Sequence, residues 1–473
     1  MKLIPTMGLE IHAELMTASK IFCGCSAEYG GAPNTRCCPG CAAFPGTLPA
    51  LNKKAVELII KAGAITNCEI SRQTKWDRKN YFYPDLPKAY QVSQLFKPTC
   101  TGGHVDIKTA NGDKRIRIKQ IHLEEDAGKL IHDQSPKYSL ADHNRGGTPL
   151  IEIVTEPDFH TAEEVCAFVE KIRAALQYAE ICDGKMEQGS LRCDVNISLA
   201  PENSPILGVR AEIKNLNSVR SITRAIEFEI DRQTEAIENG EKLYQQTRRF
   251  SDENGETYAM RDKENAADYR YFPDPDIPLL EINEEELKAI IATIPEMPEA
   301  RYERYVTEME LSEHNAKILI GSSTLSNFFE AALKEYNNPK AISSFIVTEV
   351  LSFEDFDFSA ESAKNIGLLV SHSTTGKISR DTAKAVLRAM IESESGKTPD
   401  AICDENNYWI KEDLSLVDSV IDEVIANNPA VVEQYKNGEQ KVFGFLMGQC
   451  AKSLKGAATP AVIKSALDAK LKE

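Results

Sequence analysis

The stretch Ile121–Gly128 reads Ile-His-Leu-Glu-Glu-Asp-Ala-Gly and places three consecutive acidic residues after alternating apolar and polar residues. We interpret it as a strand that delivers Glu125 and its neighbours to the end of a sheet, because apolar residues at every second position are typical of a half-buried strand. Acidic residues are unfavourable in strands, so their repulsion needs compensation. A divalent cation with carboxylate ligands would supply it. The alternative is a charged strand end that faces water.

The composition is that of a large, acidic globular protein. A chain of 473 residues exceeds what one hydrophobic core usually organises, so two to four domains are expected. The formal net charge of −17 argues against nucleic-acid binding by bulk charge and leaves only local contacts. No apolar run approaches the roughly 20 residues of a membrane span, and the first residues lack a signal-peptide profile. We therefore expect a cytoplasmic protein without a membrane partner.

Five of the 12 cysteines are clustered near the N-terminus. In cytoplasmic proteins such clusters are more often metal sites than disulfides. Cys23 and Cys25 form one closely spaced pair, and Cys38 and Cys41 have the spacing in which a tight turn directs both thiolates at one ion. Four thiolates suit a structural zinc ion, and unmetallated thiols are the alternative. Cys37 is expected to be a bystander.

Four predicted strands, at residues 9–15, 150–154, 191–198 and 209–214, combine an apolar face with a face of charged residues and asparagine. Glu152 stands out, because a lone carboxylate in an apolar strand is costly unless it is paired or bound to metal. We predict a largely antiparallel sheet whose polar face holds Mg²⁺ and phosphate oxygens, as phosphoryl transfer requires. The chain has no P-loop and no dinucleotide fingerprint, so any ATP would bind to this sheet.

Other elements follow from spacing. Helices are expected at residues 52–64 and 161–178, the second capped by Thr161. The apolar residues Ile116 and Ile118 have even numbers, whereas Ile121 and Leu123 have odd numbers. A bulge or crossing is therefore expected near Lys119 or Gln120, so that all four can face the same side. The segment 75–91 is basic, aromatic and interrupted by proline, and it is predicted as a functional loop; a packed surface loop is the alternative.

Several motifs resemble those of the B subunit of the tRNA-dependent amidotransferase. They are Gly-Leu-Glu-Ile-His at 8–12, Ile-Phe-Cys-Gly-Cys at 21–25, Pro-Asn-Thr at 33–35 with Cys38 and Cys41, Lys-Asn-Tyr-Phe-Tyr-Pro-Asp-Leu-Pro-Lys at 79–88, His-Leu-Glu-Glu-Asp-Ala-Gly at 122–128, Gly-Ser-Leu-Arg-Cys-Asp at 189–194, Glu-Ile-Lys-Asn-Leu-Asn-Ser at 212–218 and Asp-Tyr-Arg-Tyr-Phe-Pro at 268–273. The motifs are long and occur in the family's order, so the chain is similar to this family from residue 8 onward.

The resemblance implies a heterotrimer of this chain with an amidase (A) subunit and a small C subunit; a non-discriminating aminoacyl-tRNA synthetase is a further candidate partner. The amidase would release ammonia from glutamine. The B subunit would activate the side-chain carboxylate of Glu-tRNA(Gln) or Asp-tRNA(Asn) with ATP and amidate the acyl phosphate. The implied fold class is α+β: a largely antiparallel cradle domain similar to those of glutamine synthetase and guanidino kinases, then an all-α domain and a small helical tail.

The resemblance also suggests roles for individual residues. The catalytic set would be Glu10, His12, Lys79, Glu125, Asp126, Glu152, Arg192, Asp194 and Glu212. His12, Glu125 and Glu152 would bind Mg²⁺, although His12 has a rival role as a hydrogen-bond donor to phosphate. The residues expected near ATP are Lys79, Arg192, Arg210 and Lys214.

Three domains are expected: a cradle domain with the cysteine loop at 1–294, a helical domain at 295–410 and a helical tail at 411–473. Prolines from 273 to 298 mark the first transition. The tail is locally basic, because residues 430–473 contain seven lysines and four acidic residues. The family's tail contacts tRNA, so Lys441, Lys452 and Lys455 are candidate phosphate contacts. A solvated helix face is the alternative.

Two other functions stay open. The sheet could serve a small-molecule kinase or amide ligase, and the chain could be a non-catalytic, zinc-containing scaffold that binds tRNA. The tail and the ordered motifs favour the amidotransferase over the first, and the full set of carboxylates favours it over the second. The chain has no Ser-Lys pair in a Gly/Ser-rich segment. Glutamine hydrolysis is therefore expected to belong to another subunit.

Overall fold

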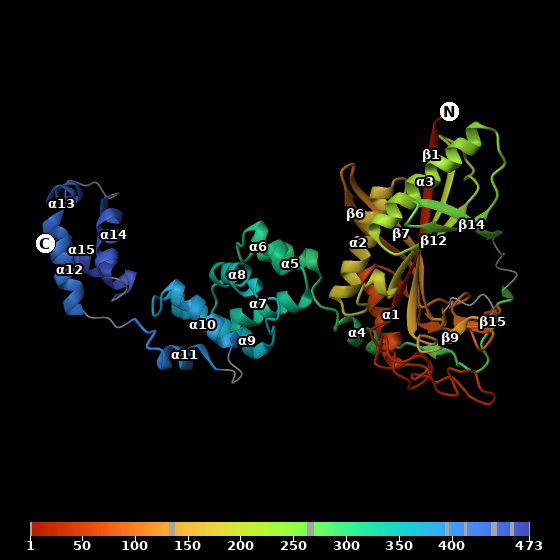
Figure 1. Ribbon diagram of the computed structural model, residues 1–473, viewed down its shortest axis with the longest axis horizontal. Coiled ribbons are helices and arrows are strands. Elements are labelled where there is room, and N and C mark those ends of the chain that lie inside the picture. The colour runs from red at the N-terminus through yellow and green to blue at the C-terminus, as the bar shows by residue number, and fades with distance from the viewer. Residues whose placement is uncertain are drawn as a thin grey trace. The chain divides into compact units, whose positions relative to one another are not determined.

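The computed structural model describes residues 2–131, 138–262, 269–392, 397–410, 414–436, 442–454 and 458–472. These residues form two compact units, Met1–Met297 and Pro298–Glu473 (Figure 1). The first unit combines a large, mostly antiparallel sheet with helices, and the second is helical. The predicted α+β class is therefore confirmed.

The first unit is built on a nine-stranded sheet in the order β14-β13-β12-β11-β1-β10-β7-β6-β2. Its strands are β1 (Leu3–Glu14), β2 (Glu69–Ile70), β6 (Cys100–Thr109), β7 (Gly112–Glu125), β10 (Pro149–Thr155), β11 (Leu191–Pro201), β12 (Ala211–Leu216), β13 (Gln246–Ser251) and β14 (Glu256–Asp262). Each neighbouring pair is antiparallel except β12 and β13, which are parallel. The long strand β1 lies near the centre and joins both halves.

The register of the central strands aligns their polar residues. His12 of β1 lies opposite Glu152 of β10 and Arg192 of β11, and Glu152 in turn lies opposite His122 of β7. Directly opposed residues project from the same face of an antiparallel sheet. The pairing of β10 with β7 shifts from Gln120 to Ile118, which confirms the predicted bulge at Lys119. Without this bulge the residues after it would face the other way.

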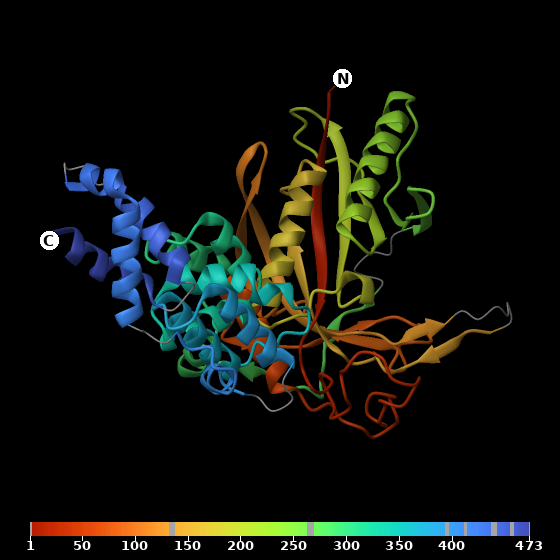
Figure 2. The same ribbon diagram turned by 60° about the vertical axis from the view of Figure 1, so that its left-hand side comes forward.

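Three helices cover the apolar face of the sheet: α1 (Lys53–Ile65), α2 (Ala162–Tyr178) and α3 (Val219–Glu238) (Figure 2). Their buried residues form one core with Leu9 and Ile11 of β1. Side chains alternate along a strand, so Glu10 and His12 project to the opposite face. Asn52 and Thr161 accept hydrogen bonds from backbone N–H groups at the starts of α1 and α2, and the cap at Thr161 was expected from the sequence.

Smaller elements surround the end of the large sheet. Strands β4 (Asp77–Asn80), β5 (Tyr90–Ser93) and β15 (Phe272–Pro273) form a three-stranded sheet. Two more pairs are β3 (Gln73–Thr74) with β16 (Leu280–Glu281) and β8 (Lys129–Ile131) with β9 (Leu140–Asp142). The segment predicted as one loop, 75–91, is therefore a pair of strands joined by residues 81–89. Trp76, which directly precedes β4, is fully buried. The strands of this segment are too short to produce a periodic pattern of apolar residues, so the sequence did not reveal them.

Helix α4 (Glu284–Ile291) closes the first unit. The second unit contains α5 (Pro298–Thr307), α6 (Glu313–Leu319), α7 (Ser323–Glu335), α8 (Pro339–Thr348), α9 (Ala360–Thr374), α10 (Arg380–Glu392), α11 (Pro399–Glu405), α12 (Leu414–Asn427), α13 (Pro429–Lys436), α14 (Phe443–Leu454) and α15 (Pro460–Lys472). Helices α5 to α11 share one hydrophobic cluster, and α12 to α15 share another. Among the described residues, no helix has both the length and the apolar character that a membrane span needs.

Candidate active site on the polar face of the sheet

A cavity of about 670 Å³ lies over the polar face of the sheet. Its floor comes from β1, β7, β10 and β12, and its wall comes from residues 79–85 and from Tyr269 and Tyr271. The predicted residues that line it are Glu10, His12, Lys79, Glu152, Arg210, Glu212 and Lys214. Residues from distant parts of the sequence therefore meet here because the central strands are adjacent.

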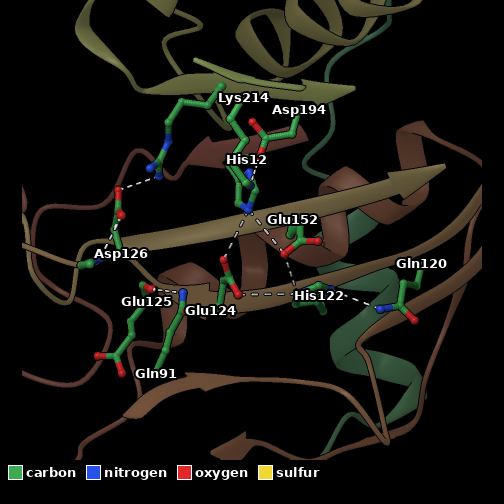
Figure 3. Close-up of polar contacts among 12 residues, drawn as sticks. His12, Gln91, Gln120, His122, Glu124, Glu125, Asp126, Glu152, Asp194 and Lys214 are labelled. Atoms are coloured by element: carbon green, nitrogen blue, oxygen red, sulfur yellow. Dashed lines mark hydrogen bonds and ion pairs between the residues drawn. The ribbon is translucent and has the colours of Figure 1, made fainter. Parts of the chain in front are cut away.

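The first cluster in the cavity contains two histidines and two carboxylates. His12 Nε2 lies 3.4 Å from Glu152 Oε2 and 3.8 Å from Glu124 Oε1. His122 Nε2 lies 3.3 Å from Glu152 Oε2 and 3.6 Å from Glu124 Oε2. Figure 3 shows both imidazoles facing the same two carboxylates. The cluster follows from register, since His12, Glu152 and His122 are neighbours across three strands.

Mutual attraction controls the charges of this cluster. Burial alone would lower the pKa of each histidine, but Glu152 and Glu124 raise the pKa of His12 above its ordinary value and that of His122 to about 10. Burial alone would raise the pKa of Glu152, but His122 and His12 hold it well below its ordinary range. A cationic partner therefore stabilises the ionised carboxylates in this low-dielectric site.

A second cluster contains Glu10, Asp194 and Glu212. Asn196 Nδ2 donates to Glu10 Oε1 at 3.0 Å. Lys214 Nζ lies 2.6 Å from Asp194 Oδ2 and 3.0 Å from Glu212 Oε1. Burial, together with the charges of Glu152 and Glu212, raises the pKa of Glu10. Crowded carboxylates of this kind would be stabilised by additional positive charge.

The donor atoms of both clusters suit divalent cations. In the part of the chain that the structure describes, the ligand atoms of His12, Glu124 and Glu152 lie within 4.8 Å of one another, as do those of Glu10, Asp194 and Glu212. Carboxylate oxygens are the ligands that Mg²⁺ prefers. Burial and the neighbouring carboxylates raise the pKa of Glu10, and a bound cation would counter the effect of these negative charges. Glu10, Asp194 and Glu212 therefore fit a hard cation by composition and spacing, and in the His12 cluster Glu124 and Glu152 supply the oxygen ligands.

Basic residues complete the cavity. Lys79 lies beside the rings of Tyr269 and Tyr81, with its Nζ 4.9 and 5.8 Å from their centroids. Burial alone would lower the pKa of Lys79, but Glu124 and Glu152 raise it. Arg210 also lines the cavity, although β12 begins at Ala211 and Arg210 therefore precedes the strand to which the sequence assigned it. These cations can contact a phosphate while the carboxylates bind metal.

Glu125 does not join the cluster with which it was predicted to act. Its carboxylate forms an ion pair with Lys88 and accepts a hydrogen bond from the Val92 N–H at 2.9 Å. It lines a separate cavity of about 230 Å³ together with Cys23 and Cys41. Adjacent strand residues face opposite sides, so Glu124 and not Glu125 reaches His12 (Figure 3).

Asp126 and Arg192 form a third group next to the cavity and are not among the described residues that line it. Arg192 Nη2 lies 2.7 Å from Asp126 Oδ2, and Arg145 Nε lies 3.5 Å from the same oxygen. Burial, then the charge of Asp126, raises the pKa of Glu14 to about 8. The predicted placement of Arg192 beside ATP is not supported by this geometry, because its guanidinium is held by Asp126.

His122 and Glu124 were missed as site residues, although the sequence contains the signal for both. Ile121 and Leu123 point into the core. The period of two therefore assigns His122 and Glu124 to the polar face. The aromatic wall formed by Tyr81, Tyr269 and Tyr271 had no such signal, because it depends on two distant segments that meet only in the folded chain.

The four predicted cysteine ligands come together. The Sγ atoms of Cys23, Cys25, Cys38 and Cys41 lie within 4.8 Å of one another. The Cys38 N–H donates to Cys41 Sγ at 3.2 Å, and a hydrogen bond from Cys23 helps to lower the pKa of Cys41. Cys37 is outside this group, as expected. Four thiols in such a loop fit a tetrahedral metal ion.

Of the predicted tRNA contacts, Lys452 lies on α14 with an exposed side chain. Lys441 and Lys455 lie outside the described residues. Nearby tail residues Leu446, Cys450 and Leu454 are buried. The helix therefore has an apolar side in its core and presents Lys452 to solvent.

Comparisons with known proteins cover nearly the whole chain. Residues 5–288 match the family model described as the GatB/GatE catalytic domain, and residues 327–471 match that described as the GatB domain. The B subunit of the aspartyl/glutamyl-tRNA(Asn/Gln) amidotransferase of Ruminiclostridium cellulolyticum is 50% identical over 476 residues, which cover 100% of this chain and 98% of the relative. The protein of the same name from Caldicellulosiruptor bescii is 48% identical to this chain, and the aligned residues cover 99% of this chain and 98% of the relative. The one from Thermodesulfovibrio yellowstonii is 46% identical, with 99% of each covered.

Proposed function

The chain belongs to the family of aspartyl/glutamyl-tRNA(Asn/Gln) amidotransferase B subunits, and from that premise we propose that its cavity activates and amidates a tRNA-bound side-chain carboxylate. The overall reaction converts Glu-tRNA(Gln) or Asp-tRNA(Asn) to the amidated form, as a glutamine-dependent ligase does. The observation that carries this proposal is the meeting of two carboxylate clusters and three cations around one cavity. Phosphoryl transfer needs both kinds of charge.

The reaction has two steps in this proposal. First, an oxygen of the substrate carboxylate attacks the γ-phosphorus of ATP, the bond to the β–γ bridging oxygen breaks, and ADP leaves. Second, ammonia attacks the carbonyl carbon of the acyl phosphate and loses a proton, and phosphate leaves with one of the original carboxylate oxygens. Both steps need positive charge near the phosphoryl oxygens.

The residues of the cavity have distinct tasks. Mg²⁺ bound by His12, Glu124 and Glu152 and by the Glu10 cluster would neutralise phosphate charge. Lys79 and Arg210 hold the transferred phosphoryl group, and Lys214 orients Asp194 and Glu212. His12 keeps its alternative role as a donor to phosphate. The aromatic wall excludes water, which protects the acyl phosphate from hydrolysis.

The remaining expectations extend this proposal to partners and cofactors. An amidase subunit, assembled with a small third subunit, supplies ammonia, since this chain lacks an amidase signature. Zinc at the four cysteines stabilises their loop. Lys452 and the neighbouring lysines of the tail contact tRNA phosphates. A likeness of the antiparallel cradle to glutamine synthetase and guanidino kinases fits the same chemistry, because those enzymes also place metal-bound phosphates on a sheet.

The test is co-expression with the amidase and small subunits, followed by assays on Glu-tRNA(Gln) and Asp-tRNA(Asn) with and without ATP. We expect ATP-dependent amidation by the wild type and much slower amidation by Glu124→Gln at the same Mg²⁺ concentration, with glutamine hydrolysis and tRNA binding retained. A scaffold would tolerate Glu124→Gln. A small-molecule ligase would amidate a free acid and ignore both tRNAs. Either result would replace the proposal.

A further inference from the structure

One residue at the cavity edge has no task in the proposed chemistry. Phe82 is 78% exposed, the largest fraction among the exposed large hydrophobic residues of the described chain. It lies between two hollows, because it lines both the reaction cavity and a second, open cavity of about 370 Å³. Tyr83 in the reaction cavity and Phe272 in the second cavity are also exposed, so these rings form an aromatic surface beside the reaction site that a bound substrate can contact.

The loop that carries Phe82 is firmly anchored. Tyr81 donates its N–H to Ala89 O at 3.2 Å, and its hydroxyl donates to Gln91 Oε1 at 3.2 Å. Asp85 O accepts from the Gly128 N–H at 2.9 Å, and Leu86 is buried. The ring is therefore exposed on a loop fixed from both sides. A fixed ring loses little conformational freedom on binding, which favours a recognition role.

The second cavity is lined by aromatic rings and two cations, of which Lys88 is ion-paired with Glu125. It is lined by Asn80, Phe82, Lys88, Ala89, Tyr90, Arg270 and Phe272. The guanidinium of Arg78 lies 4.2 Å from the centre of the Tyr90 ring and ion-pairs with Asp274 at 2.7 Å, which fixes this surface. Asn80 Nδ2 donates to Arg270 O at 2.8 Å and ties the two segments together. Rings combined with cations are the surface that single-stranded nucleic acid binds.

We propose that the single-stranded 3′ end of the tRNA crosses this second cavity and that Phe82 stacks on its terminal adenine, so that the attached amino acid enters the reaction cavity. This inference rests on the proposed function and adds the residue that positions the substrate. Only a substrate that extends from outside to inside would contact both cavities. ATP is the other source of an adenine, but its phosphates must reach the metal clusters, whereas Phe82 lies at the exposed edge.

The test uses the complete complex and two tRNAs, one with and one without the 3′-terminal adenosine. Phe82→Ala should weaken affinity for the complete tRNA by roughly fivefold or more, as loss of one base stack implies. It should leave affinity for the shortened tRNA nearly unchanged. Phe82→Trp should bind the complete tRNA about as tightly as the wild type does, because it keeps an aromatic ring at this position. Phe96→Ala is the matched control, because Phe96 is 61% exposed but lines neither cavity.

Other results would overturn the inference. Equal weakening of both tRNAs by Phe82→Ala would mean that the ring does not contact the terminal base, and no weakening would mean that it does not contact tRNA. A raised KM for ATP with an unchanged KM for tRNA would assign the ring to the nucleotide. The affinities for the two tRNAs are measured without turnover. A complex that binds tRNA but fails to amidate would therefore refute the proposed function, and the affinities would still test the contact between Phe82 and the terminal adenine.

Discussion

Glu124 and Glu125 are consecutive residues of β7, and their carboxylates lie on opposite sides of the sheet. Glu124 reaches within 3.8 Å of His12 Nε2, whereas Glu125 accepts from the Val92 N–H at 2.9 Å and pairs with Lys88. The strand thus contributes one acid to the reaction cavity and one to the cavity beside the cysteine loop. The two residues have the same chemistry and different surroundings, so they form a natural matched pair.

Glu124→Gln should weaken activation by Mg²⁺, because it removes an anionic ligand from the His12 cluster. We expect the Mg²⁺ concentration for half-maximal amidation to rise by roughly tenfold or more. Glu125→Gln should leave this concentration unchanged, whatever it does to the maximal rate. The measurement is amidation against Mg²⁺ concentration in the assembled complex. A shift of equal size in both variants would contradict the assignment of the metal to Glu124.

Much of this arrangement could be predicted from the sequence. The parity of apolar residues revealed the polar face of β1, β10 and β11 and the bulge at Lys119, because burial of one sheet face leaves a period of two. The same period of two places Glu124, and not Glu125, on the polar face. Glu125 was predicted as a Mg²⁺ ligand from the family motif and not from this period. The placement of Arg192 beside Asp126 and the aromatic wall around Lys79 could not be predicted, because both depend on the packing of segments distant in sequence.

The cysteine loop supplies a second matched pair. Cys38→Ser should lower the bound zinc content and the melting temperature, since zinc bound only by the folded loop stabilises it. Cys37→Ser should change neither, because Cys37 lies outside the group of four. Elemental analysis of the purified protein and thermal unfolding provide the measurements. Equal losses in the two variants, or a metal-free wild type with unchanged stability in chelator, would contradict a structural zinc site.

Glu229 of α3 should be important for stability although it is not among the described residues that line the reaction cavity. It is fully buried, and it accepts from Arg232 at 2.6 Å, Gln233 at 2.9 Å and Thr257 at 3.0 Å. Glu229→Ala removes the acceptor of Arg232 and of the buried Gln233 and Thr257, so the free energy of unfolding should fall by about 3–5 kcal/mol.

Urea unfolding followed by Trp76 fluorescence measures this change, in a Trp409→Phe background so that only the first unit reports. Glu238→Ala is the control, because Glu238 is exposed on the same helix. A loss below about 1 kcal/mol for Glu229→Ala would show that the network relaxes without cost.

Lys452→Ala should weaken tRNA binding uniformly across tRNA sequences. A phosphate contact releases counterions, so its removal should reduce the slope of log affinity against log salt by about one. Filter binding of the complex at several salt concentrations gives this slope. Lys384→Ala, on α10, is a control from a helix of the other hydrophobic cluster, where Lys384 ion-pairs with Glu349 at 3.0 Å. An unchanged slope in Lys452→Ala would mean that this lysine faces only solvent.

The most direct test of the central claim follows one oxygen atom. Glu-tRNA(Gln) labelled with ¹⁸O in its side-chain carboxylate is converted by the complex with ATP and ammonia, and the released phosphate is analysed by mass spectrometry. If the cavity makes an acyl phosphate, the phosphate will carry one carboxylate oxygen, and Glu124→Gln will slow this transfer together with amidation. Amidation that releases unlabelled phosphate would contradict the account.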